Sequence, residues 1–355
     1  MLNNPPQFSK KLIQWYLKNK RSMPWRETTN SYHIWLSEII LQQTRVAQGL
    51  PYYLAFTTNF PTVELLAQAP EEEVLKLWQG LGYYSRARNL HHTAKVVSNE
   101  LNGVFPDTYE ALLKLKGVGD YTASAIGSFC FDLPTAVVDG NVYRVLARYF
   151  GIETPINSTN GIKEFKALAQ QLIDVKQPGL YNQAIMEFGA LHCAPQNPDC
   201  GSCIFSDSCH ALQQKKVTAL PVKIKAAKVK KRYFNYMVVI SEENKTILKQ
   251  RTQKGIWLQL YEFPLIESAN SLSLEQLRAE SKFKDFTAKI AIDSITLYKT
   301  EAVIHKLSHQ HLYTHFWIVN TVQPLKDGVP IAEIRSYAVP VLIANFISSF
   351  SGFKA

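Results

Sequence analysis

The chain has 355 residues, which is enough for two ordinary domains and too many for one small core. Hydrophobic residues make up 46% and charged residues 19%, a composition that excludes a disordered chain. Lys and Arg number 39 against 29 Asp and Glu, a net charge of +10 that favours an anionic partner, although it also serves solubility. No apolar run is long enough to cross a membrane and the first residues lack signal-peptide features, so we expect a cytoplasmic protein with no membrane partner.

The first 215 residues are predicted to be helical, because apolar residues recur there at helical spacing between Gly and Pro breaks. The predicted helices include Gln7–Lys18, Ile34–Gln43, Glu71–Trp78, Thr108–Leu115 and Tyr121–Phe131.

The composition then changes. Lys215–Arg232 holds seven Lys, one Arg and no acidic residue, and we interpret residues 216–232 as a basic, poorly packed linker. Residues 233–355 mix β-branched and aromatic runs with helical periodicity and are predicted to form an α+β domain. Its predicted strands are Tyr233–Ile240, Thr246–Gln250, Leu297–His305 and His311–Val319, and its predicted helices are Leu272–Ser281 and Val339–Phe350.

Four cysteines, Cys193, Cys200, Cys203 and Cys209, follow the pattern C-x6-C-x2-C-x5-C. Cytosolic proteins rarely keep structural disulfides, so thiolate ligands to a metal centre are the better interpretation. Spacing alone leaves zinc and a [4Fe–4S] cluster about equally favoured. The fifth cysteine, Cys130, lies in an apolar helical stretch and is interpreted as a small buried hydrophobic residue.

Gly117 and Gly119 form a G-x-G turn between two predicted helices. Such a turn allows close backbone approach, and free N–H groups at the start of the second helix can bind a phosphate. By itself, however, the pattern is also that of a plain helix–helix turn.

Two acidic residues stand in informative surroundings. Glu38 is flanked by Leu36, Ile39 and Ile40, and a buried carboxyl with a raised pKa suits a general acid. Asp139 precedes an amphipathic helix. The simpler interpretations are a solvent-facing Glu and an ordinary helix N-cap. Together, two carboxyl groups suit hydrolysis of a glycosidic bond, in which one donates a proton and the other stabilises a cationic sugar.

These segments resemble the endonuclease III and MutY glycosylase superfamily, in family order and over nearly the whole chain. The cysteine spacing resembles its iron–sulfur loop, and residues 115–123 resemble the helix-hairpin-helix motif L-x-G-V-G-x-x-T-A. The segments around Glu38 and Asp139 resemble the MutY motifs S-E-x-x-L-Q-Q-T and V-D-G-N-V. The resemblance implies a helix-hairpin-helix catalytic domain over residues 1–215 and a [4Fe–4S] cofactor.

By this resemblance, Glu38 protonates adenine, Asp139 stabilises the oxocarbenium-like sugar, and Asn141 orients the water or the sugar. Bifunctional relatives carry a Lys where this chain has Tyr121. A phenol cannot form an imine, so the prediction is base removal without strand cleavage.

Substrate contacts are implied in the same way. P-W-R places Trp25 and Arg26 near a flipped adenine, and Gln183 faces its edge, although Trp25 is equally compatible with the core and Gln183 with the surface. G-L-G-Y-Y-x-R implies that Tyr83 wedges beside 8-oxoguanine while Arg86 holds phosphate; a helix joint with core tyrosines is an equal alternative. The residues implied to line or fill the gap in the DNA are Gln43 and Thr44.

The C-terminal domain resembles the Nudix-like module of MutY through G-x-W-x-x-x-x-E-F-P at residues 255–264. The Nudix metal box R-E-x-x-E-E is absent, so a binding role is expected instead of Mg²⁺-dependent hydrolysis. Ser308 and His309 match an F-S-H loop that contacts 8-oxoguanine, but Leu307 replaces the Phe. We therefore predict a monomeric, monofunctional and nucleoid-associated enzyme that acts on double-stranded DNA containing adenine opposite 8-oxoguanine or guanine. A thymine-specific relative and a non-catalytic DNA-binding iron–sulfur protein are the alternatives.

Overall fold

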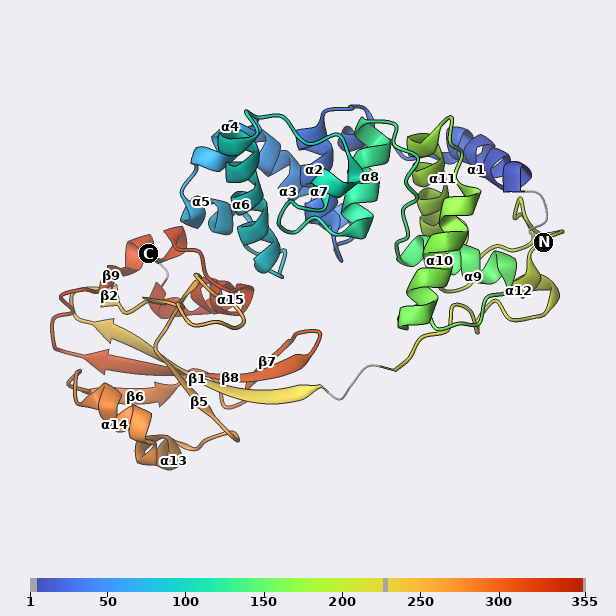
Figure 1. The fold of residues 1–355 in the computed structure, drawn as a ribbon. Coiled ribbons are helices and arrows are strands. Elements are labelled where there is room, and N and C mark those ends of the chain that lie inside the picture. The colour runs from blue at the N-terminus through green and yellow to red at the C-terminus, as the bar shows by residue number, and fades with distance from the viewer. Residues whose placement is uncertain (1–4, 226–228, 354–355) are drawn as a thin grey trace. The chain divides into compact units, whose positions relative to one another are not determined.

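The computed structural model describes residues 5–225 and 229–353, and its packing divides the chain into two units. The first comprises residues up to Ala69 together with Arg88–Lys225, and the second comprises Pro70–Ala87 together with the chain from Ala226 onward. Figure 1 shows that the first unit is helical and that the second is built around a sheet.

Several helices of the first unit begin at polar residues whose side chains cap them. Asn30 accepts hydrogen bonds from the backbone N–H groups of Tyr32 and His33, and Thr62, Thr108 and Ser158 cap later helices in the same manner. Its helices are α1 (Pro5–Asn19), η1 (Pro24–Arg26), α2 (Ser31–Leu41), α3 (Val46–Asn59), α4 (Val63–Gln68), α6 (Ser85–Glu100, which starts in the second unit), α7 (Tyr109–Leu112), α8 (Asp120–Cys130), α9 (Gly140–Phe150), α10 (Thr159–Leu172), α11 (Pro178–Leu191) and α12 (His210–Gln213).

The second unit is organised by two long strands, β1 (Lys230–Ser241) and β8 (Gln310–Thr321), which run parallel with Tyr236 opposite Phe316. They lie at the centre of a sheet with the order β5-β1-β8-β6, and β7 also pairs with β8. Its other elements are α5 (Glu71–Leu77), β2 (Lys245–Thr246), β3 (Lys249–Gln250), β4 (Tyr261–Glu262), β5 (Leu265–Ser268), α13 (Leu274–Ala279), α14 (Ser281–Thr287), β6 (Ser294–Leu297), β7 (Val303–Lys306), β9 (Val329–Pro330), η2 (Ile331–Ser336), α15 (Val341–Ser349) and η3 (Ser351–Phe353).

Side chains alternate across this sheet, as a strand requires. Met237 and Trp317 pack in one core with Leu277 and Phe283 of α13 and α14. The residue before each of these, Tyr236 or Phe316, points to the opposite face of the sheet. Phe316 stacks there on Phe346 of α15 with 4.0 Å between ring centroids. Helices therefore cover both faces of the sheet (Figure 1), and the predicted α+β architecture of this domain is confirmed.

Several predicted boundaries are wrong. Residues 297–305 do not form one strand: the chain breaks between β6 and β7, where the Tyr298 ring turns to contact Phe346 and Phe350 of the C-terminal segment. Residues 246–250 fall into two short strands with different partners, β9 and β4. The helix predicted over residues 108–115 ends at Leu112.

The predicted domain limits at residues 215 and 233 also differ from the observed division. Leu220 is 3% exposed in the core of the first unit, where its carbonyl accepts a hydrogen bond from Arg148 Nε, so residues 215–225 belong to that unit. Residues 226–228 of the predicted linker lie outside the described residues. Residues 70–87 join the second unit, because Lys76 donates to the Tyr337 carbonyl at 3.1 Å and Tyr261 donates to Glu72 at 2.7 Å.

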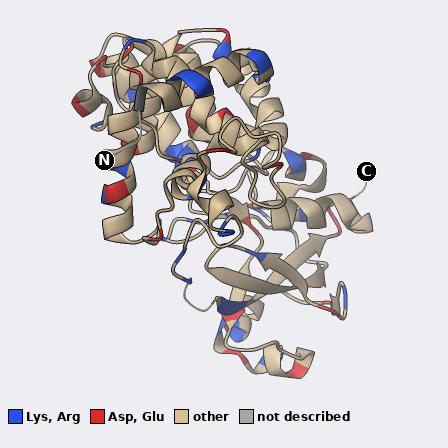
Figure 2. Ribbon diagram, turned by 90° about the vertical axis from the view of Figure 1, so that its right-hand side faces the viewer, with Lys and Arg blue, Asp and Glu red and all other residues tan. Residues whose placement is uncertain are grey.

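Basic residues are distributed over many helices, strands and loops and are interspersed with acidic ones (Figure 2). Residues 193–209, which carry the four clustered cysteines, include no Lys or Arg. Within the described residues, no helix is long and apolar enough to span a bilayer.

Close packing of α9 against α11 depends on Gly189. A Cβ added there would lie 2.6 Å from the Asn141 Cβ and 3.0 Å from the Asn141 carbonyl oxygen. Backbone cannot give way as a flexible side chain can, so the two helices would have to separate.

We therefore expect Gly189→Ala to lower the free energy of unfolding by about 1–3 kcal/mol. The matched control is Gly140→Ala on α9, where an added Cβ meets nothing within 4 Å and should change stability little. Urea unfolding followed by far-UV circular dichroism measures both. Equal midpoints for the two variants would contradict the proposed close packing.

Candidate functional site

A cavity of about 200 Å³ in the first unit brings together side chains from η1, α2, α8, α11 and the start of α9. Drug-sized ligands occupy about 300–1,000 Å³, so this space suits a single flat ring system. Its lining includes Arg21, Met23, Trp25, Arg26, Glu38, Thr44, Tyr121, Asp139, Asn141, Gln183, Met186 and Glu187.

Glu38 reaches the cavity from α2, a helix with buried residues on all sides. Its side chain is 8% exposed, and burial raises the pKa of its carboxyl to about 7. A hydrogen bond with Tyr121 and the charge of Arg26 lower this pKa, whereas the charge of Asp139 raises it further. The interpretation of Glu38 as a solvent-facing residue is therefore wrong.

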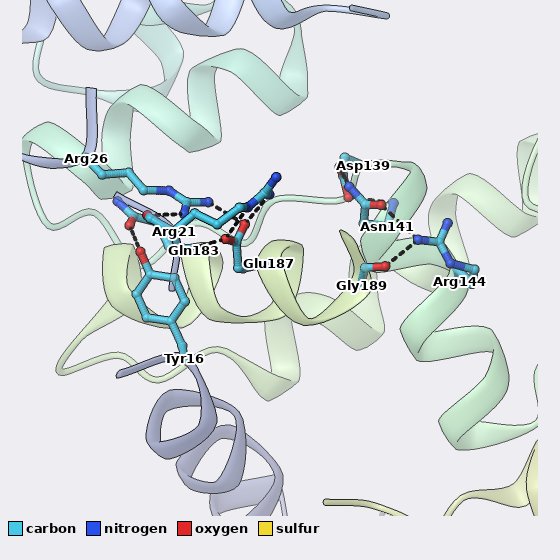
Figure 3. A network of polar contacts seen from close by, with 9 residues as sticks. All are labelled: Tyr16, Arg21, Arg26, Asp139, Asn141, Arg144, Gln183, Glu187 and Gly189. Atoms are coloured by element: carbon cyan, nitrogen blue, oxygen red, sulfur yellow. Dashed lines mark hydrogen bonds and ion pairs between the residues drawn. The ribbon is translucent and has the colours of Figure 1, made fainter. Parts of the chain in front are cut away.

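Asp139 is the N-cap of α9, as the simpler interpretation predicted, and its carboxyl also lines the cavity. One carboxylate oxygen accepts the backbone N–H groups of Asn141 and Val142 at 2.8 Å each, and the other accepts Asn141 Nδ2 at 2.7 Å. Burial raises the pKa of this carboxyl, while these donors and the Arg144 charge lower it. Arg144 in turn donates to Asn141 Oδ1 at 2.9 Å and to the Gly189 carbonyl at 2.6 Å (Figure 3).

The two carboxyl groups therefore lie in one cavity with different environments. Glu38 is bonded to the Tyr121 phenol, whereas Asp139 accepts three N–H donors and lies near a guanidinium. Donors and a nearby cation stabilise an anion, and desolvation favours the neutral acid. The arrangement suits a proton donor and an anion placed on either side of a bound group.

The residues expected to bind a base line the same cavity. Trp25 is 9% exposed and packs edge-on against Tyr53 with 5.0 Å between ring centroids, so it belongs to the core while bordering the cavity. Gln183 accepts a hydrogen bond from the Tyr16 hydroxyl at 2.5 Å, and Arg26 lies over the Tyr16 ring. Gln183 is therefore not a free surface residue.

The sequence analysis missed Tyr16, Arg21, Met186 and Glu187. Glu187 is 1% exposed and binds both Arg21 and Arg26, whose guanidinium groups converge on it in Figure 3. An available signal was the acidic residue in the otherwise apolar run of residues 184–191. Its partners could not be identified in this way, because they lie more than 160 residues earlier in the chain.

The hairpin before α8 has the expected backbone. Gly117 has φ of +83°, and a Cβ there would lie 2.9 Å from the Asn89 Cβ, so both the turn and the close approach require glycine. Gly119 is the N-cap of α8 without a side-chain cap, and it faces open space. The first N–H groups of an uncapped helix suit a phosphate oxygen. Tyr121 lies in the first turn of this helix. Its hydroxyl is a hydrogen-bond partner of Glu38 and lies 3.3 Å from Met186 Sδ.

Gln43 and Thr44 follow the end of α2. Gln43 is exposed with φ of +55°, so the strained backbone turns its side chain outward. Thr44 lines the cavity, and its hydroxyl donates to the Gln42 carbonyl at 3.3 Å. Thr44 is therefore part of the cavity lining, whereas Gln43 lies outside it.

Within the second unit, Tyr83 is 47% exposed and its hydroxyl hydrogen-bonds to Ser308, in the turn between β7 and β8. His309 is exposed in the same turn. Arg86 differs from expectation: it is 9% exposed, donates to the Leu81 and Gly82 carbonyls, and lies 5.6 Å from the Tyr83 ring centroid. These contacts direct the Arg86 guanidinium toward backbone carbonyls of the Tyr83 turn. Burial lowers its pKa to about 10, so the group still carries its charge near neutral pH.

Cys193, Cys200, Cys203 and Cys209 border one small cavity of about 30 Å³ next to Arg148. N–H donors approach two of the sulfurs: Arg148 Nη1 lies 3.5 Å from Cys193 Sγ, and the Phe205 amide lies 3.4 Å from Cys203 Sγ. Over the ranges 5–225 and 229–353, no three Cys, His, Asp or Glu side chains are gathered closely enough to hold a metal ion. The donor set fits a thiolate-bound centre, because the four cysteines border one cavity and N–H donors approach two of their sulfurs. Cys130 lies apart from them, and burial raises the pKa of its thiol to about 12.

Comparison with known families gives two matches. Residues 36–174 match the HhH-GPD superfamily of base excision DNA repair proteins, and residues 235–349 match the NUDIX domain. Among solved structures, the chain resembles a thermostable thymine-DNA glycosylase at 31% identity and a TM-score of 0.55, over 59% of this chain and 97% of that one. An endonuclease III–DNA complex, 21% identical with a TM-score of 0.52, covers 60% of this chain and 99% of its own and shows the fold alone.

Among curated proteins, the adenine DNA glycosylase of Buchnera aphidicola subsp. Baizongia pistaciae is 33% identical over 88% of this chain and 86% of the relative. The adenine DNA glycosylase of Rattus norvegicus is 46% identical over 60% of this chain and 44% of that protein. The predicted fold class and the predicted family are thereby confirmed. The chain belongs to the adenine DNA glycosylase family, the hydrolases that remove adenine in base excision repair.

Proposed function

We propose that this enzyme removes adenine opposite 8-oxoguanine or guanine in double-stranded DNA, with Glu38 as general acid and Asp139 as the anion beside the sugar. The observation that carries the proposal is the single cavity in which these two carboxyl groups meet. The same cavity holds an aromatic plane, a guanidinium and an amide, which are the groups that suit a flipped base.

In the proposed reaction, adenine leaves the helix and enters the cavity. The Glu38 proton passes to adenine N7, which turns the base into a neutral leaving group as the N-glycosidic bond breaks. The electron pair of that bond stays with the base, and the positive charge develops on the sugar. The raised pKa of Glu38 supports this role, because about half of the acid is protonated near pH 7.

Asp139 then stabilises the cationic sugar, and Asn141 orients the sugar or the attacking water. Support comes from the hydrogen bonds that hold the Asp139 carboxylate in one orientation while its charge remains close to the cavity. Water attacks C1′, its proton is lost, and an abasic site remains. Tyr121 has no amine, so no imine forms and the strand is left intact.

For the DNA, we propose that the N-terminus of α8 behind Gly117 and Gly119 binds a phosphate. Tyr83, Ser308 and His309 would contact the 8-oxoguanine side, with Gln43 and Thr44 next to the vacated stack. The exposed Tyr83 ring and its link to Ser308 support a wedge held in a defined orientation. The enzyme needs only one copy of the chain for these contacts.

We also propose that Cys193, Cys200, Cys203 and Cys209 bind a [4Fe–4S] cluster. When bound, the cluster would cross-link the loop and hold it folded against α9. Arg148 would remain close to it, donating to the Ala194 and Pro195 carbonyls as it does here.

The first test uses a duplex with adenine opposite 8-oxoguanine, and the parent is expected to release adenine with strand cleavage only after alkali. Glu38→Gln should bind the duplex but excise adenine about 10²–10⁴-fold more slowly, because its side chain cannot donate the acidic proton. Single-turnover excision and a gel-shift titration measure the two properties. Parental rates in this variant, a preference for thymine, or nicking without alkali would each contradict the proposal.

The pH dependence gives a second prediction. Glu38 acts in its protonated form, so excision should be fast below its pKa of about 7 and fall about tenfold per unit above it. Single-turnover rates across this range, at constant ionic strength, measure this falling limb of the pH–rate profile. A rate that rises with pH through this region would assign Glu38 the role of a base instead.

The cluster is tested by iron and sulfide analysis of the purified protein. Cys200→Ser and Cys203→Ser should each lose most of the bound iron, and the visible absorbance should fall with it. Cys130→Ser is the matched control and should keep the parental iron content, because Cys130 lies outside the cysteine cavity. Zinc in the parent, or equal iron in all three variants, would contradict the cluster assignment.

A further inference from the structure

Glu187 is a charged residue of the cavity to which no role has yet been given. It stands on α11, one turn after Gln183, and its side chain is 1% exposed. Although burial raises its pKa, hydrogen bonds from Arg21 and Arg26 hold that pKa at about 2. Glu187 is therefore an anion throughout the working pH range of an enzyme.

Two arginines share this carboxylate. Arg21 approaches it with its backbone N–H at 3.1 Å, Nε at 2.7 Å and Nη2 at 2.7 Å, and Arg26 Nη2 lies 2.8 Å away. Arg26 also donates Nη1 to the Arg21 carbonyl at 3.1 Å. The Glu187 carboxylate and the Arg21 carbonyl thus hold the Arg26 guanidinium in one orientation at the wall of the cavity (Figure 3).

The charges matter because Glu38 must keep a proton. The groups that face Glu38 are Arg26 from η1, Tyr121 and Cys130 from α8, and Asp139 from the start of α9. A cation close to a carboxyl favours its ionised form, so Arg26 works against a general acid. Glu187 is the anion bound directly to Arg26, and it offsets that charge inside a poorly solvated site.

We propose that Glu187 is a positioning residue that orients Arg26 toward the bound base and offsets its charge so that Glu38 keeps its proton near neutral pH. The inference rests on the proposed function, since it assumes that Glu38 is the general acid. It adds a third acidic group to the site, one that never exchanges a proton with the substrate and acts through an arginine.

The test compares pH–rate profiles of the parent and Glu187→Gln in single-turnover excision of adenine opposite 8-oxoguanine. The amide can still accept hydrogen bonds but carries no charge. The falling limb should therefore move to lower pH, and a shift of about one unit gives an about tenfold lower rate above the limb. Below the limb the two rates should differ much less. A uniform loss at every pH, with the limb unmoved, would overturn the inference.

Two further variants keep the test decisive if Glu187→Gln folds poorly. Glu187→Asp retains the charge, so its limb should stay at the parental pH even if the maximum rate falls. The double variant Glu187→Gln with Arg21→Gln removes one anion and one cation, and its limb should return toward the parental position. Failure of this return would also overturn the charge argument.

Glu153→Gln is the matched control, because Glu153 is exposed and pairs with Lys216 away from the cavity, so its limb should not move. Failure of the proposed function looks different from failure of this inference. If the parental limb persists in Glu38→Gln, Glu38 is not the group that titrates and the function as proposed is wrong. If the limb vanishes in Glu38→Gln but Glu187→Gln leaves it unmoved, only the role of Glu187 is rejected.

Discussion

The unequal hydrogen bonding of two buried carboxyl groups in one cavity is the constraint on which the site depends. A protein can hold a neutral acid and an anion a short distance apart only if their surroundings differ, because their charges would otherwise push both pKa values in the same direction. Glu38 is bonded to a phenol and loses solvation by burial, whereas Asp139 receives N–H donors at the end of a helix. The helix dipole favours the anion at that end. The two roles that we propose, proton donor and stabilising anion, thereby fall on residues with different hydrogen-bond partners.

The fold produces this difference through close helix packing. The α2 helix is buried along most of its length, which removes water from Glu38 without any special local motif. The α9 helix begins at the cavity, and Gly189 lets α11 approach it closely enough for Arg144 to bind the Gly189 carbonyl and Asn141 together. The Arg21–Glu187–Arg26 group lines another part of the cavity, where one anion lies between two cations and offsets part of their charge. Packing thus removes water from both carboxyl groups, and the hydrogen-bond donors at the start of α9 favour the ionised form of Asp139.

Local patterns in the sequence were sufficient to predict some of this. Helical periodicity and the G-x-G turn predicted α2 and the α8 hairpin, because each signal lies within a few residues. The apolar run around Glu38 left a solvent-facing position open, and only the packing of α2 shows that this residue is buried. Glu187 was missed because its partners, Arg21 and Arg26, are distant in sequence and a lone Glu does not identify them. The inclusion of residues 70–87 in the second unit was missed for the same reason, since the contact between Lys76 and the Tyr337 carbonyl joins segments far apart in the chain. An arginine beside aromatic residues in the sequence can either bind a phosphate or support a turn of the chain. The sequence does not distinguish these two roles, whereas the burial of Arg86 favours the second.

The cysteine loop and the catalytic carboxylate are mechanically connected, although neither contacts the other. Arg144 donates Nε to the Cys193 carbonyl at 2.7 Å and Nη2 to Asn141 Oδ1, and Asn141 in turn donates to Asp139. One guanidinium therefore satisfies acceptors on the loop, on α11 and beside the active anion. If the loop loosened, Arg144 would lose its anchor, and Asp139 would lose both an oriented neighbour and part of the positive charge that favours its ionised form. A loop that carries no Lys or Arg of its own can thus influence the chemistry through the orientation of one buried arginine on α9.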